Sequence, residues 1–344
     1  MDSEGILPND YDFFSYLRLT VECSHRQTVT TKLQNCKISW QNRAFRNLRR
    51  THMLSGTMDD DASAERLRRG GYTRERARFP SADGISLAAD LFLPAGASNP
   101  HDADERKSSS NGTKSDADDD LIATVADRAF RDGTHAMVTA HAHPKFGGSP
   151  DMMHRLCAHM ASSGCKVVNL HLRGAGASGG VGSWQGTGGE VCDARAAIDF
   201  AVRELGATRV HLMGYSFGST VLGAAIDHRR EVATYTAIAY PLGTFHAWSK
   251  GAMGFGAKLL MRAHCGAVRA SRTPKLFVVG DKDDFTKVST LRRFAYGCEG
   301  GTGVNKFIEY ERANHFGFVT SPWSGRVCDD VRGFIADASL LDTR

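Results

Sequence analysis

The chain has 344 residues, which is more than an average domain needs but within the range of one α/β domain with additional segments. Hydrophobic residues make up 41% and charged residues 24%, and this balance excludes a wholly disordered chain and a fibrous protein. The net charge of +5 is too mild to indicate nucleic-acid binding by itself, and no apolar run reaches the about 18 residues of a membrane helix.

Residues 1–72 alternate short apolar clusters with polar runs and show no sustained helical or strand period. We predict a poorly ordered amino-terminal extension, and its first 30 residues contain no apolar core of a signal peptide. The basic stretch at 43–50 leaves a nucleic-acid-binding arm as an alternative function. The eight cysteines are widely spaced and form no C-x-x-C pair, which favours reduced thiols and a cytoplasmic location.

A structured domain is predicted over residues 73–344. It begins with two strands, at 76–79 and 85–93, around a turn at 81–84. Residues 97–120 are rich in Ser and Asp and almost free of apolar side chains, so this segment is predicted to be a solvated low-complexity insertion.

Strands and helices alternate after this insertion. The predicted strands are 136–142, 166–172, 209–213, 233–240, 275–279 and 306–310. The predicted helices are 151–162, 190–205, 219–228 and 324–338. Such alternation predicts an α/β fold with a mainly parallel sheet covered by helices on both faces, and ligands of such sheets bind at the carboxyl ends of strands.

One glycine-rich motif resembles a nucleotide-binding fingerprint. Residues 174–179 read GAGASG and follow a strand, but the segment GVGSWQGTGG comes next and does not open a helix. Because the pyrophosphate of a dinucleotide needs that helix start, we predict no cofactor.

The pattern G-x-S-x-G occurs around Ser178 and around Ser216. A nucleophile elbow is a sharp turn from a strand directly into a helix. Ser216 lies between the strand RVHLM and the helical sequence STVLGAAIDHR, whereas Ser178 precedes a glycine-rich loop. We therefore predict Ser216 as the nucleophile and Ser178 as a loop residue.

A serine nucleophile needs a base and a carboxylate that orients the base. Two later strand ends supply candidates, since LFVVG leads into Asp281-Lys-Asp283-Asp284 and FIEYERAN leads into His315. His315 is the predicted base and Asp283 the predicted acid, with Asp284 as the alternative acid. Isolated aspartates and histidines are usually structural, so it is the joint arrangement that carries this prediction.

An oxyanion hole needs backbone N–H groups that point at the substrate oxygen. Phe217, directly after the nucleophile, is one candidate. The loop at 141–149 reads HAHPKFGGS, and because Pro144 has no N–H the second donor is Lys145 or Phe146. His141 and His143 share one side of their strand, but no H-E-x-x-H motif accompanies them and we predict no metal site.

Together these segments resemble the α/β-hydrolase superfamily over about residues 73–344. The resemblance rests on HAHPKFGGS (141–149), RGAGAS (173–178), GYSFG (214–218), GDKD (280–283) and NHF (314–316). The most similar branch is small and largely without a cap, and it includes serine-aminopeptidase-like, dienelactone-hydrolase-like and dipeptidyl-peptidase-like domains. Ala142 stands where that branch usually has a proline.

The resemblance implies a sheet of about eight strands. It also implies that the protein is a serine hydrolase that cleaves a carboxylic ester, thioester or amide through an acyl-enzyme. The expected partner is a small-molecule acyl substrate, without nucleic acid and without a membrane span. The alternative is a catalytically silent protein of the same fold that binds a ligand. The sequence indicates neither the substrate identity nor the oligomeric state.

An open active site is expected because the segment 243–273 is too short for a folded lid domain. Part of it must return the chain to the sheet as a helix, for which 257–264 is the candidate.

Overall fold

A computed structural model describes residues 71–95, 130, 132–183, 186, 189–242, 264–300, 304–319 and 322–341. The predicted insertion at 97–120 lies outside the described residues, as does the predicted extension except for its last two residues. The first strand begins at Tyr72, four residues before the predicted strand start.

The described chain alternates strands and helices. The strands are β1 (Tyr72–Pro80), β2 (Ser86–Pro94), β3 (His135–Ala140), β4 (Lys166–His171), β5 (Arg209–Tyr215), β6 (Val232–Ile238), β7 (Lys275–Lys282) and β8 (Lys306–Asn314). The helices are α5 (His154–Ser162), α6 (Gly189–Arg203), α7 (Phe217–Ala224), α9 (Cys265–Ala270), α10 (Val288–Tyr296) and α12 (Trp323–Leu341). Short 3₁₀ helices are η3 (Pro144–Phe146), η4 (Pro150–Met153) and η6 (Gly317–Val319).

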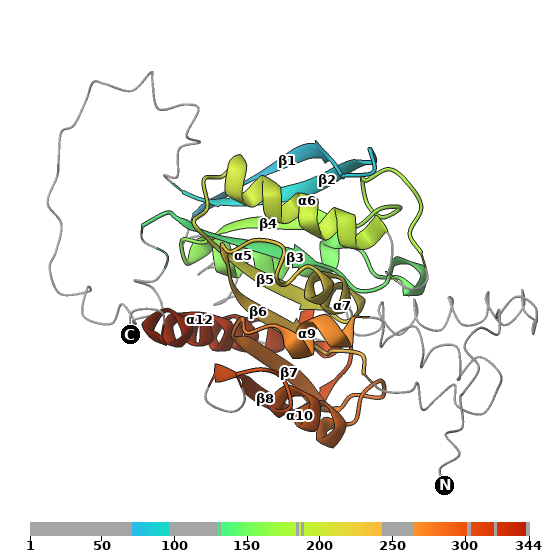
Figure 1. Cartoon of the computed structure of the whole chain (residues 1–344), viewed down its shortest axis with the longest axis vertical. Helices are drawn as coiled ribbons and strands as arrows, with labels where there is room; N and C mark the ends of the chain where they lie inside the picture. The colour runs from blue at the N-terminus through green and yellow to red at the C-terminus, as the bar shows by residue number, and fades with distance from the viewer. Residues whose placement is uncertain are drawn as a thin grey trace, which may run out of the picture. The chain divides into compact units, whose positions relative to one another are not determined.

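The eight strands form one sheet in the order β1-β2-β4-β3-β5-β6-β7-β8. β1 pairs with β2, and β2 with β4, in antiparallel register, whereas every other neighbouring pair is parallel. Figure 1 shows this sheet twisting from β1 to β8, with α6, α7 and α9 on one side of it. The predicted mainly parallel eight-stranded sheet is confirmed.

Two hydrophobic clusters fill the two faces of the sheet. On β5, Val210 and Leu212 belong to one cluster with side chains of α6, α7, α9 and α10, whereas Met213 and Tyr215 belong to the other with side chains of α5 and α12. Each fully buried aliphatic side chain stabilises the fold by about 1.5–3 kcal/mol. The central strands β3, β4, β5 and β6 are therefore buried on both sides, as a parallel sheet covered by helices requires.

Two described helices were not predicted at their positions. α10 is only nine residues long and opens with Val288, Ser289 and Thr290, which are modest helix formers, so no helix was expected there. Packing stabilises it instead, since Phe294 stacks on Tyr240 with ring centroids 5.7 Å apart. The helix predicted at 257–264 falls almost wholly outside the described residues, and α9 begins just after it.

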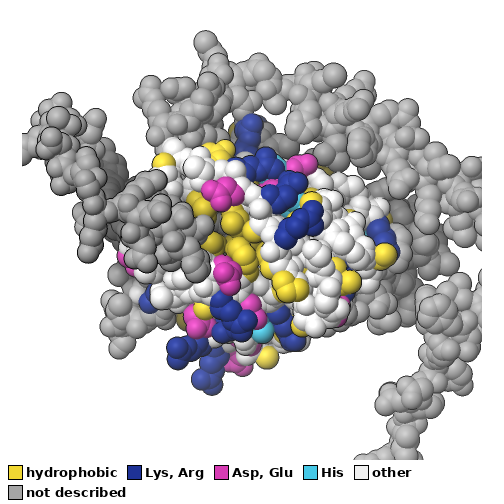
Figure 2. Space-filling model, turned by 90° about the horizontal axis from the view of Figure 1, so that it is seen from above, with side chains coloured by type: hydrophobic (Ala, Val, Ile, Leu, Met, Phe, Trp, Pro, Cys, Tyr) yellow, Lys and Arg dark blue, Asp and Glu magenta, His cyan; other side chains and the backbone are white. Residues whose placement is uncertain are grey.

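The β1 edge of the sheet carries charged side chains. Arg74, Glu75, Arg76 and Arg78 are exposed on this edge strand, where charges oppose pairing with another sheet. On the face seen in Figure 2, Lys and Arg side chains lie among Asp and Glu, with hydrophobic side chains gathered between them. None of the helices in the described part of the chain combines the length and the hydropathy that a bilayer crossing requires.

Candidate active site

Ser216 occupies a strained turn between β5 and α7. Its backbone has φ 50° and ψ −119°, a region that non-glycine residues rarely adopt. The turn leaves no residue between Ser216 and the first residue of α7, Phe217. The strand-to-helix elbow predicted at Ser216 is therefore present.

The glycines on either side of Ser216 allow close packing of this turn. A Cβ on Gly214 would lie 2.2 Å from the Ser219 Cα, and one on Gly218 would lie 2.2 Å from the Ala140 carbonyl oxygen. Both distances are far below a van der Waals contact. The G-x-S-x-G spacing is thus required by the way β5, α7 and β3 meet.

The side chains of Ser216, His315 and Asp283 form one hydrogen-bonded chain. His315 Nε2 lies 2.9 Å from Ser216 Oγ, and His315 Nδ1 lies 2.8 Å from Asp283 Oδ2. A carboxylate only accepts hydrogen bonds, so Nδ1 carries the proton and Nε2 is left to accept from the serine hydroxyl. The side chains of His315 and Asp283 are 3% and 0% exposed, which protects this chain of bonds from water.

Asp283, and not Asp284, is the carboxylate that contacts His315. Its second oxygen, Oδ1, accepts the backbone N–H groups of Phe285 and Thr286 at 2.7 and 3.0 Å. These bonds fix the carboxylate at the carboxyl end of β7, whereas the Asp284 side chain is exposed. The structure thus separates the two acids that the sequence left as alternatives.

Phe285 is a site residue that sequence reasoning missed. Its ring stacks on the His315 imidazole with centroids 3.9 Å apart and planes at 19°. This contact holds the plane of the imidazole. The only signal in the sequence was an aromatic residue two positions after the acid, which is a common arrangement without any site.

The start of α7 and the loop after β3 contribute the backbone groups considered for the oxyanion hole. The Phe217 N–H lies in the first turn of α7, where the helix itself offers no acceptor. The Lys145 N–H donates to His143 Nδ1 at 3.1 Å, and the Phe146 N–H donates to the His143 carbonyl at 3.0 Å. The N–H groups of both candidates in this loop are therefore engaged within the loop.

His141 has a structural environment. Its Nδ1 lies 2.7 Å from the Ala142 carbonyl, and its Nε2 accepts from the Leu172 N–H at 3.4 Å. Burial lowers the pKa of His141 to about 4, so the ring is neutral near pH 7. Since both ring nitrogens are engaged with the backbone, His141 positions the strand end.

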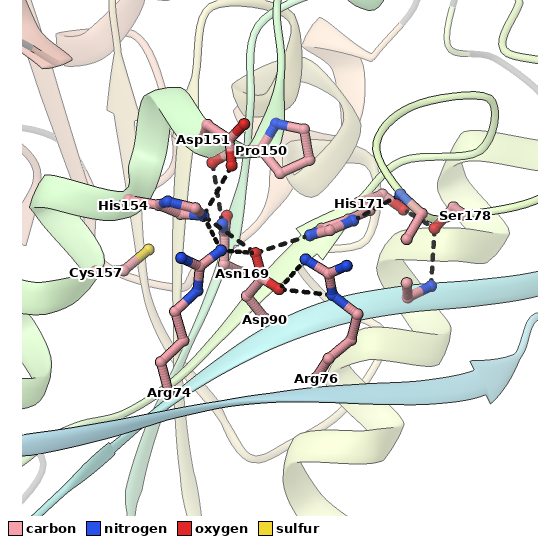
Figure 3. Close-up of polar contacts among 12 residues, drawn as sticks. Arg74, Arg76, Asp90, Pro150, Asp151, His154, Cys157, Asn169, His171 and Ser178 are labelled. Carbon is pink, nitrogen blue, oxygen red and sulfur yellow. Dashed lines mark hydrogen bonds and ion pairs between the residues drawn. The ribbon is translucent and has the colours of Figure 1, made fainter.

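Ser178 holds backbone segments together, as Figure 3 shows. Its Oγ accepts the Ala88 N–H at 2.8 Å and donates to the His171 carbonyl. This arrangement connects β2, β4 and the loop after β4. Ser178 is thus a loop serine, as the sequence predicted.

Asp90 lies at the centre of a polar cluster in the same view (Figure 3). Its buried carboxylate accepts hydrogen bonds from Arg74 and Arg76 and contacts Nε2 of His154 and His171 at 3.0 and 3.1 Å. Although burial opposes ionisation, these contacts hold the pKa of Asp90 well below its usual range. The oxygen and nitrogen atoms of Asp90, Asp151 and His154 that could bind a metal ion lie within 4.8 Å of one another. Arg74 and Arg76, however, already form ion pairs with Asp90 and neutralise its charge.

A cavity of about 200 Å³ opens beside the elbow. It is lined by Phe217, by His143 and Lys145 of the loop after β3, and by Arg173, Val181 and Glu190. Phe217 and Lys145, two of the three residues considered for the oxyanion hole, are thus among its lining residues. The segment 243–263, which bears on the predicted absence of a cap, lies outside the described residues.

A family model described as "alpha/beta hydrolase fold" matches residues 143–263. Among solved structures, an esterase of Pyrococcus furiosus superposes with a TM-score of 0.55 at 13% identity, covering 78% of this chain and 94% of the esterase. The chain has the α/β-hydrolase fold. This α/β-hydrolase-fold protein is also 28% identical to an uncharacterised protein of Rickettsia prowazekii over 111 residues, which are 31% of this chain and 46% of that protein's length.

Proposed function

We propose that this α/β-hydrolase-fold protein is a serine hydrolase that cleaves a carboxylic ester, thioester or amide through an acyl-enzyme. The proposal is carried by the chain of bonds from Ser216 Oγ to His315 Nε2 and from His315 Nδ1 to Asp283. The strained backbone of Ser216 supports it, because such strain clusters at functional sites.

In the proposed reaction, Ser216 Oγ attacks the substrate carbonyl carbon while His315 Nε2 takes the hydroxyl proton. A new C–O bond forms, the electron pair of the carbonyl moves to its oxygen, and the imidazole becomes positively charged. Asp283 stabilises that charge and keeps the proton on Nδ1. The collapse of the intermediate expels the leaving group, which receives the proton from Nε2, and the same steps with water release the acid.

The negative charge on the carbonyl oxygen requires hydrogen-bond donors. We propose the Phe217 N–H as the first donor and the Lys145 N–H as the second. The position of Phe217 at the start of α7 favours its role, because the amino end of a helix attracts negative charge. The Lys145 N–H would have to exchange His143 Nδ1 for the substrate oxygen.

The test is active-site labelling. A fluorophosphonate probe reacts only with an activated serine, so mass spectrometry of the full chain is expected to find the probe on Ser216. Ser216→Ala should lose the label and reduce hydrolysis by at least about 10⁴-fold. Ser178→Ala is the matched control: it should keep the label, while losing two hydrogen bonds of about 1 kcal/mol each in stability.

A folded wild-type protein that neither labels nor hydrolyses any member of an ester, thioester and amide panel would favour the catalytically silent alternative. We propose a small-molecule acyl substrate, which the modest volume of the cavity favours. A cytoplasmic location is also proposed, since the six cysteines in the described part of the chain are all free thiols.

A further inference from the structure

The proposed base has an aromatic side chain on the face of its ring. The ring of Phe285 stacks on the His315 imidazole, with the centroids 3.9 Å apart and the planes at 19°. Both imidazole nitrogens are already engaged at the edge of the ring, Nε2 with Ser216 Oγ and Nδ1 with Asp283 Oδ2. Phe285 therefore acts on the base through the face of the imidazole, which the proposed reaction leaves unused.

A hydrogen bond and a ring contact hold Phe285 in this position. Its backbone N–H donates to Asp283 Oδ1 at 2.7 Å, so the carboxylate that contacts His315 also fixes the main chain of Phe285. The ring of Phe316 packs edge-on against the ring of Phe285, with centroids 5.7 Å apart and planes at 86°. The Phe285 ring is thus placed over the imidazole in the free protein.

The imidazole becomes positively charged in the proposed reaction, so the charges around it matter. The titratable side chains that the structure describes in contact with this ring are Asp283, at the end of β7, and Tyr215, at the end of β5. Burial, and then Asp283, raise the pKa of Tyr215, so Tyr215 stays neutral. The side chain of His315 is 3% exposed, which leaves water little access to the charge. Stabilisation of the imidazolium thus depends on Asp283 at its edge and on the aromatic ring over its face.

We propose that Phe285 is a positioning residue that stabilises the positive charge of His315 through a cation–π contact and so strengthens the base. The face of a benzene ring carries partial negative charge, and a cation within about 6 Å of the ring centroid is attracted to it. This attraction is strongest where water is excluded. The catalytic consequence rests on the proposed function, because it requires His315 to take the proton of Ser216.

Packing alone would also place an apolar side chain against the imidazole. Packing depends on the shape of the ring, whereas a cation–π contact depends on the charge distribution of its face. Fluorine atoms on the ring withdraw electron density from the face and change the shape little. Fluorination of the Phe285 ring therefore separates the two explanations.

The first test measures protonation of the free protein. Phe285 is replaced in the full-length chain by phenylalanine with one, two or three ring fluorines, and NMR follows the pH titration of the imidazole signal that is lost in His315→Gln. The midpoint should move to lower pH with each added fluorine, because the charged imidazole loses stabilisation that the neutral form never had. Three fluorines should lower the midpoint by about 0.5–1.5 pH units, which corresponds to a desolvated cation–π contact at about 1.4 kcal/mol per unit.

Phe79 is the matched control. Like Phe285 it is half-buried, and it stacks on the ring of Phe200 with centroids 4.8 Å apart and planes at 24°. Because neither ring of that pair can take up a proton, fluorination of Phe79 should leave the His315 midpoint unchanged. Phe285→Leu keeps an apolar side chain but has no aromatic face, so it should shift the midpoint in the same direction as three fluorines.

The second test is the pH dependence of kcat/KM with p-nitrophenyl acetate as the substrate. Three fluorines on Phe285 should reduce kcat/KM about 3- to 30-fold on the plateau above the acid limb of the profile. The acid limb itself should move to lower pH together with the NMR midpoint. A purely structural role of Phe285 would lower the rate without a graded movement of this limb.

A midpoint that does not change progressively with the number of fluorines, or that moves to higher pH, would overturn the cation–π contact. Fluorophosphonate labelling of the wild type tests the proposed function separately. A graded shift in a protein that does not label rejects the hydrolase but keeps the contact between Phe285 and His315. Labelling without a graded shift rejects the contact alone.

Discussion

The hydroxyl of Tyr215 donates a hydrogen bond to the backbone carbonyl oxygen of His315 at 2.6 Å. Tyr215 directly precedes the elbow serine, so this bond joins the end of β5 to the main chain of the proposed base. Burial, and then the Asp283 carboxylate, raise the pKa of Tyr215 above its usual value, which keeps its proton available as a donor.

Tyr215→Phe is therefore expected to loosen His315 without removing any reacting group. The buried carbonyl loses its partner, at a cost of about 1–3 kcal/mol in the free energy of unfolding. We expect kcat to fall roughly 10-fold because the base is less well positioned, with little change in KM. Steady-state kinetics and urea unfolding measure the two effects, and an unchanged kcat would show that the bond has only a structural role.

Asp283→Asn should reduce kcat by about 10⁴-fold, since an amide at this position favours the wrong tautomer of His315. Asp284→Asn is the matched control, because the Asp284 side chain is exposed and it is Asp283 that hydrogen-bonds to the imidazole. It should retain nearly full activity. A comparable loss from both changes would contradict the assignment of Asp283 as the acid.

Stability should fall as the pH is lowered from about 7 to about 5. Burial lowers the pKa of His135, His141 and His211, and for His141 the value is about 4. In the unfolded chain a histidine has a pKa of about 6.5, so below that pH the unfolded state binds protons that the native state does not bind. Each buried histidine then removes up to about 1.4 kcal/mol of stability per pH unit.

Urea unfolding at several pH values tests this expectation. His211→Gln removes one of the three groups, so the free energy of unfolding should depend less steeply on pH between about 6.5 and 5. The comparison uses the slope, because the substitution also breaks the contact with His135 and changes the stability itself. A stability that rises on acidification would reverse the predicted sign.

Deletion of residues 99–119 is expected to leave the fold and the activity largely intact. This segment contains almost no apolar side chain to bury, and long surface loops add little closure entropy. Thermal unfolding and hydrolysis of the deletion variant are compared with those of the full chain. A large drop in Tm would show that the segment contributes to packing.

Parts of the fold were predictable because local sequence patterns determine them. Alternation of apolar strands with amphipathic helices identified most elements between residues 136 and 338. α10 was not predicted because its short sequence has weak helix propensity. Its stability comes from contacts with residues of β7 and of the segment after β6.

In the candidate site, too, some features were predictable from the sequence and others were decided by the tertiary structure. The sequence by itself predicted Ser216, His315 and an acid at Asp283 with Asp284 as the alternative, since each follows a strand whose end is visible in the apolar pattern, and their catalytic roles stay predictions. Only the tertiary structure separated Asp283 from Asp284, and only it brought Glu190 to a cavity beside Phe217. The physical reason is distance along the chain. His315 contacts a carboxylate that lies 32 positions away in the chain, and Arg173 contacts one that lies 90 positions away. A local sequence pattern does not determine which of several similar side chains makes such a distant contact.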